Sequence, residues 1–260
     1  MIIIGEKINA TRKSIAAALE ARDADHIIEV AAGQAKVGAA YLDVNGGAPQ
    51  AGREAENVAW LIDLVQEHTD ATVCVDTANP DAMRKGLSLA RGKPIVNSIS
   101  LEEERLGPML PIVAERECTV VALLMSDAGT PTGIEDRVER AEQLIAKLAE
   151  AGRSLDEIIV DPCFLPISTD PANGPAVVGA IAEIRRRWPD VHIGGGLSNI
   201  SFGLPKRRAV NRAAMCQCIW AGMDTAIVDP TQEGMLAAIY AAEAVAGRDE
   251  FCMNYVTKMR

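Results

Sequence analysis

Residues 72–98 have the sequence TVCVDTANPDAMRKGLSLARGKPIVNS. They begin with a short β-branched run, residues 72–75, which is followed by Asp76 and by a helix-length segment that starts near Pro80. Proline is tolerated in the first turn of a helix, because its missing N–H would have no partner there. Gly92 follows this segment and can close a helix in the left-handed conformation, just before the apolar run at residues 94–96. The stretch therefore predicts a strand, a helix and the start of the next strand.

The same alternation of short apolar runs and helix-length segments extends along the whole chain. The runs occupy residues 2–4, 41–44, 72–75, 94–96, 120–124, 158–160, 191–193 and 225–228. Continuous apolar runs of this length are typical of parallel strands that are buried on both faces. Eight strand–helix units in 260 residues predict an α/β fold, a single-domain (β/α)8 TIM barrel over residues 1–260. A doubly wound open sheet is the alternative, but the segment GEKIN at residues 5–9 is not the GxGxxG loop expected after its first strand.

The composition limits the classes of partner. Asp and Glu number 36 against 26 Lys and Arg, and this net charge of −10 argues against nucleic acid, whose binding depends on basic side chains. Three Trp, three Tyr and three Phe are too few for a base-stacking platform. No apolar run approaches the roughly 20 residues that cross a bilayer, so no membrane partner is predicted. The six cysteines contain no CxxC pair, and we expect free thiols in a cytoplasmic protein.

Histidine chemistry is also unexpected. The chain has three histidines: His26 and His68 lie in helical segments, and His192 begins a predicted strand at the end away from the catalytic face of a barrel. A His-based metal site or a histidine general base is therefore not predicted. Lys7 lies near a strand end, where we expect it to pair with a carboxylate rather than to form a Schiff base.

Polar side chains follow or end nearly every apolar run. The set comprises Glu6, Asn9, Asp43, Asn45, Asp76, Asn97, Asp127, Asp161, Ser198, Asn199 and Asp229. A single member can be explained as a helix N-cap, but in a barrel all these strand ends meet on one face, where active sites lie. Strand alternation puts Cys74 on the same side as Asp76, and Ile95 on the same side as Asn97. We expect the apolar member of each pair to fill the barrel and the polar member to line its mouth.

This arrangement suits a flat polar heterocycle. Asp76 and Asp161 can accept paired N–H bonds from an amino-pyrimidinone edge, and Asn97 can satisfy mixed donor and acceptor positions. Gly194, Gly195 and Gly196 continue a strand without side chains, so a planar ring could lie against them, with the amide of Asn199 nearby. A pterin fits this description, although from these residues alone other polar heterocycles fit as well.

Several motifs occur in the order and spacing of a known family. They are Gly5-Glu6-Lys7-Ile8-Asn9, Leu42-Asp43-Val44-Asn45, Val75-Asp76-Thr77, Val96-Asn97-Ser98, Asp161-Pro162, Gly196-Leu197-Ser198-Asn199-Ile200-Ser201-Phe202, Asn211-Arg212 and Ala221-Gly222-Met223-Asp224. Over essentially the full chain the sequence resembles the pterin-binding methyltransferases, and most closely methyltetrahydrofolate:corrinoid protein methyltransferase. That branch is related to the folate domain of cobalamin-dependent methionine synthase. The resemblance implies a cytoplasmic homodimeric (β/α)8 barrel in one-carbon metabolism. It implies a transferase that moves a methyl group between N5 of (methyl)tetrahydrofolate and the cobalt of a corrinoid (cobalamin).

The resemblance also implies roles for particular residues. Asp76, Asn97 and Asp161 match positions that bind the pterin, and Asn199 matches a residue that hydrogen-bonds near N5. Gly196, Ser198 and Arg207 match positions that line the pocket. Because a tertiary amine is a poor leaving group, N5 must gain positive character as the methyl group departs. Asn199 can stabilise that charge, and Asp43, Asp76 or solvent can complete a proton relay. We therefore predict Asn199 and Asp76 as catalytic residues, with Asp43 beside them and no metal bound by the chain itself.

Three further points complete the prediction. The basic run at residues 206–208 is either a solvated helix start or a site for the carboxylates of the folate tail. The segment at residues 190–195 matches the DxHxxG string of cobalamin domains, but it runs into a predicted barrel strand, so we expect the corrinoid on a separate protein. The alternatives to a methyltransferase are an enzyme of the dihydropteroate synthase type and a non-catalytic pterin-binding component of a corrinoid complex. The sequence does not determine the direction of methyl transfer.

Overall fold

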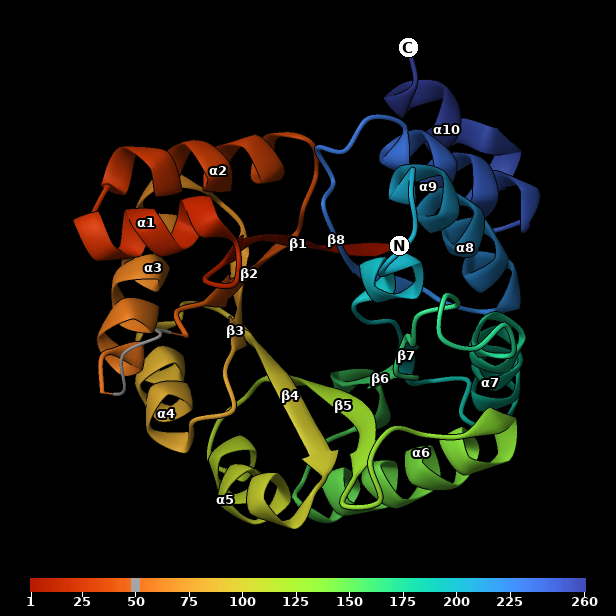
Figure 1. Cartoon of the computed structure of the whole chain (residues 1–260), viewed down its shortest axis with the longest axis horizontal. Coiled ribbons are helices and arrows are strands. Elements are labelled where there is room, and N and C mark those ends of the chain that lie inside the picture. The colour runs from red at the N-terminus through yellow and green to blue at the C-terminus, as the bar shows by residue number, and fades with distance from the viewer. Residues whose placement is uncertain (48–51) are drawn as a thin grey trace.

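The computed structural model describes residues 1–47 and 52–260, and its centre is one sheet of eight parallel strands (Figure 1). The strands are β1 (Ile2–Asn9), β2 (Tyr41–Asn45), β3 (Thr72–Asp76), β4 (Ile95–Leu101), β5 (Thr119–Ser126), β6 (Ile158–Asp161), β7 (His192–Ile193) and β8 (Thr225–Val228). Each strand lies beside its neighbour in the chain, and β8 pairs with β1. This order is the one expected when every connection is a right-handed strand–helix–strand crossover.

Backbone hydrogen bonds between β7 and β8 close the sheet into a barrel. The Asp224 N–H donates to the Ile193 carbonyl oxygen at 3.1 Å, and the Ile227 N–H donates to the Gly195 carbonyl oxygen at 3.0 Å. A Cβ atom on Gly194 would lie 1.9 Å from the Thr225 carbonyl oxygen, so only glycine allows this close approach. The predicted (β/α)8 barrel is confirmed.

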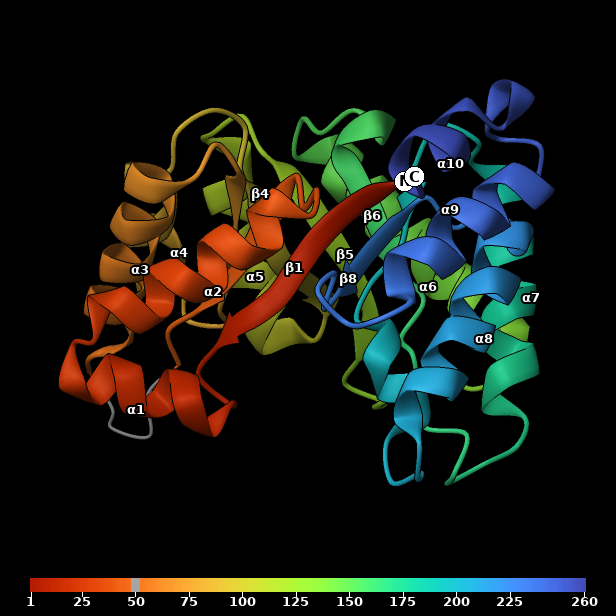
Figure 2. The same ribbon diagram turned by 90° about the horizontal axis from the view of Figure 1, so that it is seen from above.

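The helices form a ring outside the barrel, as Figure 1 shows. They are α1 (Lys13–Ala21), α2 (Ala24–Lys36), α3 (Glu54–His68), α4 (Pro80–Leu89), α5 (Glu103–Ala114), α6 (Gly133–Glu150), α7 (Asn173–Arg187), α8 (Arg207–Ala221), α9 (Met235–Val245) and α10 (Met253–Lys258). Pro80 begins α4, and Gly92 takes a φ of +65° after it, as the sequence predicts. Figure 2 shows β1 starting on the side of α10 and ending on the side of α1, which separates the amino and carboxyl ends of the barrel. Within the described residues, no helix has both the length and the apolar character needed to cross a bilayer.

Two apolar clusters fill the fold. The larger lies between the sheet and the helices, and the smaller consists of side chains inside the barrel. The inner cluster contains Ile4, Cys74, Ile95, Val121, Ile159 and Ile227. Residue 76 follows Cys74 by two positions, and residues 97 and 161 follow Ile95 and Ile159 in the same way. The polar members of these pairs therefore lie above an apolar floor, as strand alternation predicts.

Strands β1 and β4 extend furthest beyond their apolar runs. Strand β1 continues through Asn9, and its pairing with β2 shifts register between Gly5 and Ile8. Strand β4 was expected to end at Asn97 but continues to Leu101, with register shifts on either side of Ile99. Such irregularities let a strand continue through polar residues and re-aim their side chains, which is common near active sites. All six cysteines are free thiols, as predicted.

Candidate active site

Four neighbouring strands bring a carboxylate and amide cluster to the mouth of the barrel. The Asn45 side-chain amide donates to Asp76 Oδ2 at 2.9 Å, and the Asn9 amide donates to the same oxygen at 3.4 Å. The Asn97 amide donates to Asp43 Oδ1 at 3.1 Å. The structure thus brings together the three predicted residues of this region, and it adds two asparagines that the sequence placed at strand ends without assigning a role.

The cluster contains a buried acid that favours its protonated form. Asp43 is only 3% exposed, and burial together with the negative charge of Asp76 raises its pKa well above the ordinary value. Burial also raises the pKa of Asp76, although the hydrogen bond from Asn45 opposes this effect. Two carboxyl groups in such proximity favour sharing a proton, and Asp43, the more buried one, is the member that holds it. The protonated Asp43 carboxyl can therefore donate a proton at the mouth, and we call it the proton store.

Asp161 ends β6 on the other side of the mouth. Its Oδ1 accepts the Cys163 N–H at 2.9 Å, and its Oδ2 accepts the Gly196 N–H at 3.4 Å. Burial nevertheless raises the pKa of Asp161 to about 6. A Cβ atom on Gly195 would lie 2.0 Å from Asp161 Oδ2, so this glycine makes room for the acid.

The glycine strip consequently has a narrower role than the sequence suggests. The space beside Gly194 is filled by Thr225, and the space beside Gly195 is filled by Asp161. At Gly196 the nearest neighbouring atom is Asn199 Nδ2, 3.3 Å from an added Cβ. A planar ring can therefore approach the chain at Gly196 but not along all three glycines, because barrel closure and Asp161 occupy the rest.

Asn199 lies on a short 3-10 helix, Leu197–Ser201, which directly follows the glycines. Its side chain is exposed to solvent, and Arg207 forms hydrogen bonds with the turn that carries it. The Arg207 guanidinium donates to the Ser198 carbonyl oxygen at 2.6 Å and to the Ser201 hydroxyl at 2.9 Å, and it lies 6.0 Å above the Phe202 ring. These bonds fix the backbone of the turn that carries the Asn199 amide. A direct contact between Arg207 and a ligand stays a prediction.

Glu6 joins the two sides of the mouth and was not among the predicted site residues. The Ser198 hydroxyl donates to Glu6 Oε2 at 3.3 Å, and Arg12 forms an ion pair with Glu6 Oε1 at 3.0 Å. Burial is the largest cause that raises the pKa of Glu6, and the charge of Asp229 adds to it. The sequence places Glu6 among the polar residues at the strand ends but assigns it no role, because its contact with Ser198 joins residues far apart in the chain.

The expected ion pair of Lys7 is wrong. Its ammonium donates to the Thr231 hydroxyl at 3.1 Å, and this hydroxyl donates to Asp229 Oδ1 at 2.6 Å. Across residues 1–47 and 52–260, Lys7 has no carboxylate within ion-pair distance. Thr231 thus stands between Lys7 and Asp229, in the loop after β8.

His192 lies at the amino end of the barrel. Its Nδ1 is 3.1 Å from Asp224 Oδ2, and Arg185 forms an ion pair with the same oxygen at 2.9 Å. The histidine of the DxHxxG string thus belongs to a polar cluster at the amino end of the barrel, consistent with a chance match. In the part of the chain that the structure describes, no group of three or more His, Cys, Asp or Glu side chains could hold a metal ion.

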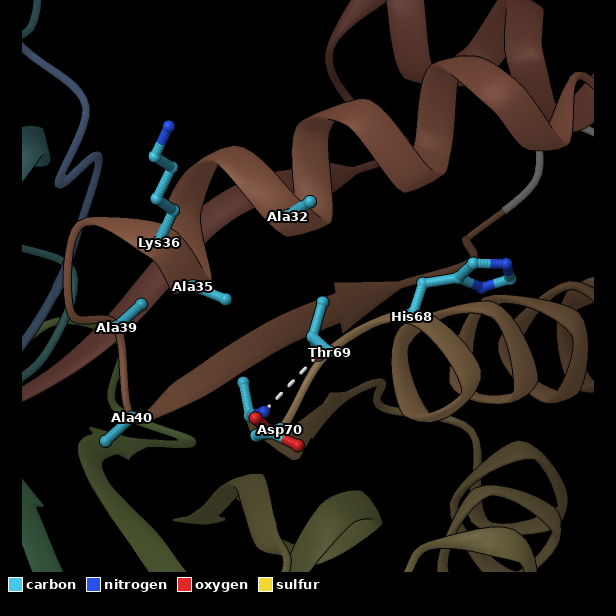
Figure 3. Close-up of a pocket in the computed structure, with 9 residues that line it drawn as sticks. Ala32, Ala35, Lys36, Ala39, Ala40, His68, Thr69 and Asp70 are labelled. Carbon is cyan, nitrogen blue, oxygen red and sulfur yellow. Dashed lines mark hydrogen bonds between the residues drawn. The ribbon is translucent and has the colours of Figure 1, made fainter.

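A surface pocket of ≈ 380 Å³ lies between α2 and α3 (Figure 3). Figure 3 shows Ala32, Ala35 and Lys36 on α2, with Thr69 and Asp70 opposite them. The Ala71 N–H donates to the Thr69 hydroxyl at 3.3 Å, directly before β3. Because these residues precede β2 and β3, the pocket belongs to the amino end of the barrel and not to the mouth.

Comparison with known proteins identifies the family. The profile described as pterin binding enzyme matches residues 5–229, which include the acids, the glycines and the Asn199 turn. The chain belongs to the pterin-binding enzyme family. It is 35% identical over 263 residues to the methylcorrinoid:tetrahydrofolate methyltransferase of Eubacterium limosum, with 100% of this chain and 96% of that protein covered. It is also 30% identical over 242 residues to methionine synthase of Mycobacterium tuberculosis, covering 88% of this chain and 20% of that much longer enzyme.

Solved structures share the fold of this pterin-binding enzyme. A dihydropteroate synthase from Xanthomonas albilineans, in complex with 7,8-dihydropteroate, superposes with a TM-score of 0.72 at 20% identity, covering 94% of this chain and 92% of that one. The dihydropteroate synthase of Coxiella burnetii, in complex with pteroic acid, gives a TM-score of 0.68 at 18% identity, covering 94% and 93%. These likenesses concern the barrel and do not choose between the reactions of the family.

Proposed function

We propose that this enzyme transfers a methyl group between N5 of (methyl)tetrahydrofolate and the cobalt of a corrinoid carried by a separate protein. The observation that carries the proposal is the pairing of a buried acid, Asp161, with an exposed amide, Asn199, on either side of the open Gly196. This arrangement occurs in a chain that aligns over its full length with a methylcorrinoid:tetrahydrofolate methyltransferase.

The acids fit the pterin ring of a folate. Asp161 uses one position on each oxygen for backbone N–H groups, which leaves acceptor positions for the paired N–H donors of an amino-pyrimidinone edge. Asp76 and Asn97 offer further polar contacts from β3 and β4. Because these groups are preorganised by their own hydrogen bonds, they can fix the ring without reorganising when it binds.

The opposite edge of the ring is where the methyl group leaves or arrives. Asn199 is placed to hydrogen-bond near N5 and to stabilise the positive charge that develops there. A neutral amide does not supply a proton at neutral pH, whereas protonated Asp43 and its partner Asp76 can do so through water. The residues of this chain thus position the ring and control one proton, while the cobalt chemistry belongs to the corrinoid substrate.

The basic residues at the start of α8 suit the anionic tail of a folate. Lys206 and Arg208 are exposed at the positive end of the helix dipole, where cations are unfavourable unless an anion binds. Arg207 is engaged with the Asn199 turn, so Lys206 and Arg208 are the members available to the tail carboxylates.

A direct assay tests the function. The purified chain is mixed with cob(I)alamin and methyltetrahydrofolate, and the absorbance of cob(I)alamin is followed. Conversion to methylcobalamin supports the proposal. Folate binding without any change in absorbance would support a non-catalytic pterin-binding component, and formation of dihydropteroate from its precursors would support the synthase alternative.

The remaining features of the proposal follow from the same resemblance. We expect a cytoplasmic homodimer in which residues 1–260 act as one domain, with the mouth of each barrel open to a corrinoid protein.

A further inference from the structure

Arg137, on α6, is a fully buried cation behind the loop that follows Asp161. Its side chain is 0% exposed, and its guanidinium donates to the carbonyl oxygens of Pro162 at 2.7 Å, Cys163 at 3.2 Å and Gly133 at 2.7 Å. Among the residues that the structure describes, it has no carboxylate within ion-pair distance. A buried charge without an ion partner is costly, so a simple packing role would be served better by an apolar side chain.

The loop that Arg137 holds has an unusual backbone. Cys163 has a φ of +60°, a conformation that side chains other than glycine rarely adopt. In this conformation its N–H points back to Asp161 Oδ1 at 2.9 Å. The planar guanidinium binds two successive carbonyl oxygens, those of Pro162 and Cys163. It therefore fixes the peptide group that carries this N–H, between Pro162 and Cys163, and the peptide group that follows it.

The positive charge of Arg137 also acts on Asp161. Burial raises the pKa of Asp161, and the groups that oppose this are the N–H groups of Cys163 and Gly196 together with the charge of Arg137. Arginine keeps its charge even though burial lowers its pKa, because its ordinary pKa is so high. The other charged groups around Arg137 are Asp136 and Arg140, which form an ion pair with each other at 2.7 Å.

We propose that Arg137 is a positioning residue for the pterin-binding acid: it fixes the loop at residues 162–163, whose backbone N–H donates to Asp161, and it holds a positive charge behind that loop. The proposal rests on the proposed function, because an ionised Asp161 is what accepts the paired N–H groups of a pterin.

Arg140 provides a matched control. It lies one turn further along α6 and is also buried, at 7% exposed. Its guanidinium donates to the carbonyl oxygens of Leu124 at 3.3 Å and Gly129 at 2.6 Å, and it pairs with Asp136. Replacing it removes a buried arginine from the same helix while leaving the loop after Asp161 untouched.

The test compares Arg137→Met, Arg137→Lys and Arg140→Met with the wild-type enzyme. The dissociation constant for methyltetrahydrofolate is measured by calorimetry between pH 5 and pH 8.5. Wild-type affinity should fall as the pH drops through the range in which Asp161 gains a proton. In Arg137→Met this decline should begin at a higher pH, and affinity at pH 8 should fall on the order of tenfold, the effect of losing hydrogen bonds to a charged group. Arg137→Lys keeps a cation without the planar fork, so its decline should lie closer to that of the wild type while affinity at pH 8 stays reduced.

Titration of the Asp161 carboxyl by carbon NMR gives a readout that does not depend on folate, with Asp161→Asn identifying the signal. A shift of this titration to higher pH in Arg137→Met, and not in Arg140→Met, is expected. The proposal would be overturned if the Asp161 carboxyl titrates at the same pH in the wild type, Arg137→Met and Arg140→Met. It would also be overturned if Arg137→Met and Arg140→Met lose affinity for folate equally. If Arg137→Met does not fold, the proposal is tested on Arg137→Lys. It would be overturned if this variant binds folate as tightly as the wild type and its Asp161 carboxyl titrates at the same pH. Failure of the wild type to bind folate, with the carboxyl titration shifted as expected, would refute the proposed function and leave the link between Arg137 and Asp161 intact.

Discussion

Asp161→Asn should make the unliganded protein more stable while it weakens folate binding. Burial raises the pKa of Asp161 from 3.8 to about 6, and at about 1.4 kcal/mol per pKa unit the ionised acid costs the folded state about 3 kcal/mol. Because this pKa is raised on folding, the cost is absent at pH values below 3.8, grows between pH 3.8 and about 6, and is fully present above. Asparagine removes the charge, but its amide NH₂ faces one of the two backbone N–H donors, which costs about 1–2 kcal/mol.

The net expectation at pH 8 is a gain of about 1 kcal/mol, or a rise in Tm of about 2–4 °C for a chain of this size. Below pH 5 the gain in stability should vanish, because Asp161 of the folded wild type is then protonated and carries no charge either. Folate affinity should fall about a hundredfold, since one of the two hydrogen bonds to the carboxylate becomes a contact between two N–H donors and the other is no longer made to a charged oxygen. Calorimetric unfolding and folate titration across the pH range measure both effects.

Asp224→Asn is a control of opposite sign. Asp224 accepts bonds from Arg185, His192 and the Ile193 N–H, and its pKa is lowered although burial alone would raise it. An acid whose pKa is lowered on folding stabilises the fold above its unfolded pKa, and this stability is lost as the pH falls. Asp224→Asn should therefore lower Tm at pH 8 and leave folate affinity unchanged. A Tm for Asp161→Asn below that of the wild type at pH 8, with unchanged folate affinity, would refute the reasoning for Asp161.

Three other substitutions address the mechanism and the fold. Asn199→Ala should reduce methyl transfer about 10²–10³-fold, the usual effect of losing one group that stabilises developing charge, and weaken folate binding; wild-type turnover in the cob(I)alamin assay would remove Asn199 from the mechanism. Asp43→Asn removes the buried proton store beside Asp76, so the rate of methyl transfer should fall more than folate affinity does, and a rate equal to that of the wild type across pH 6–8 would contradict the relay. Gly194→Ala places a Cβ 1.9 Å from the Thr225 carbonyl oxygen and should destabilise the barrel by more than about 3 kcal/mol, a loss that denaturant unfolding would detect.

Much of the site was predictable because its signals are local. The runs of apolar residues fix the strands, and the side-chain period of two places Asp76, Asn97 and Asp161 on the same side as buried partners of the inner cluster. A (β/α)8 barrel then brings those strand ends together whatever the details of packing. The resemblance to a family supplied the identity of the ligand, which the acids alone left open among polar heterocycles.

Other features depend on contacts between distant parts of the chain. Glu6 contacts Ser198, and Lys7 contacts Thr231, where the pairing of β1 with β2 is irregular. The apolar run at residues 2–4 does not predict either contact, because both partners lie about 200 residues away in the chain. Gly195 is glycine because the Asp161 carboxylate occupies the place of its side chain.

The sequence by itself determined the alternation of strands and helices and the acidic character of the strand ends, because both are set by neighbouring residues. Only the tertiary structure decided the charge states at the mouth, since the pKa of Asp43 and that of Asp161 depend on burial and on groups far away in the chain. It also decided that Arg137, a residue of an amphipathic helix, lies against the loop beyond Asp161. Solvent exclusion and long-range proximity are properties of the closed barrel, and no local pattern encodes them.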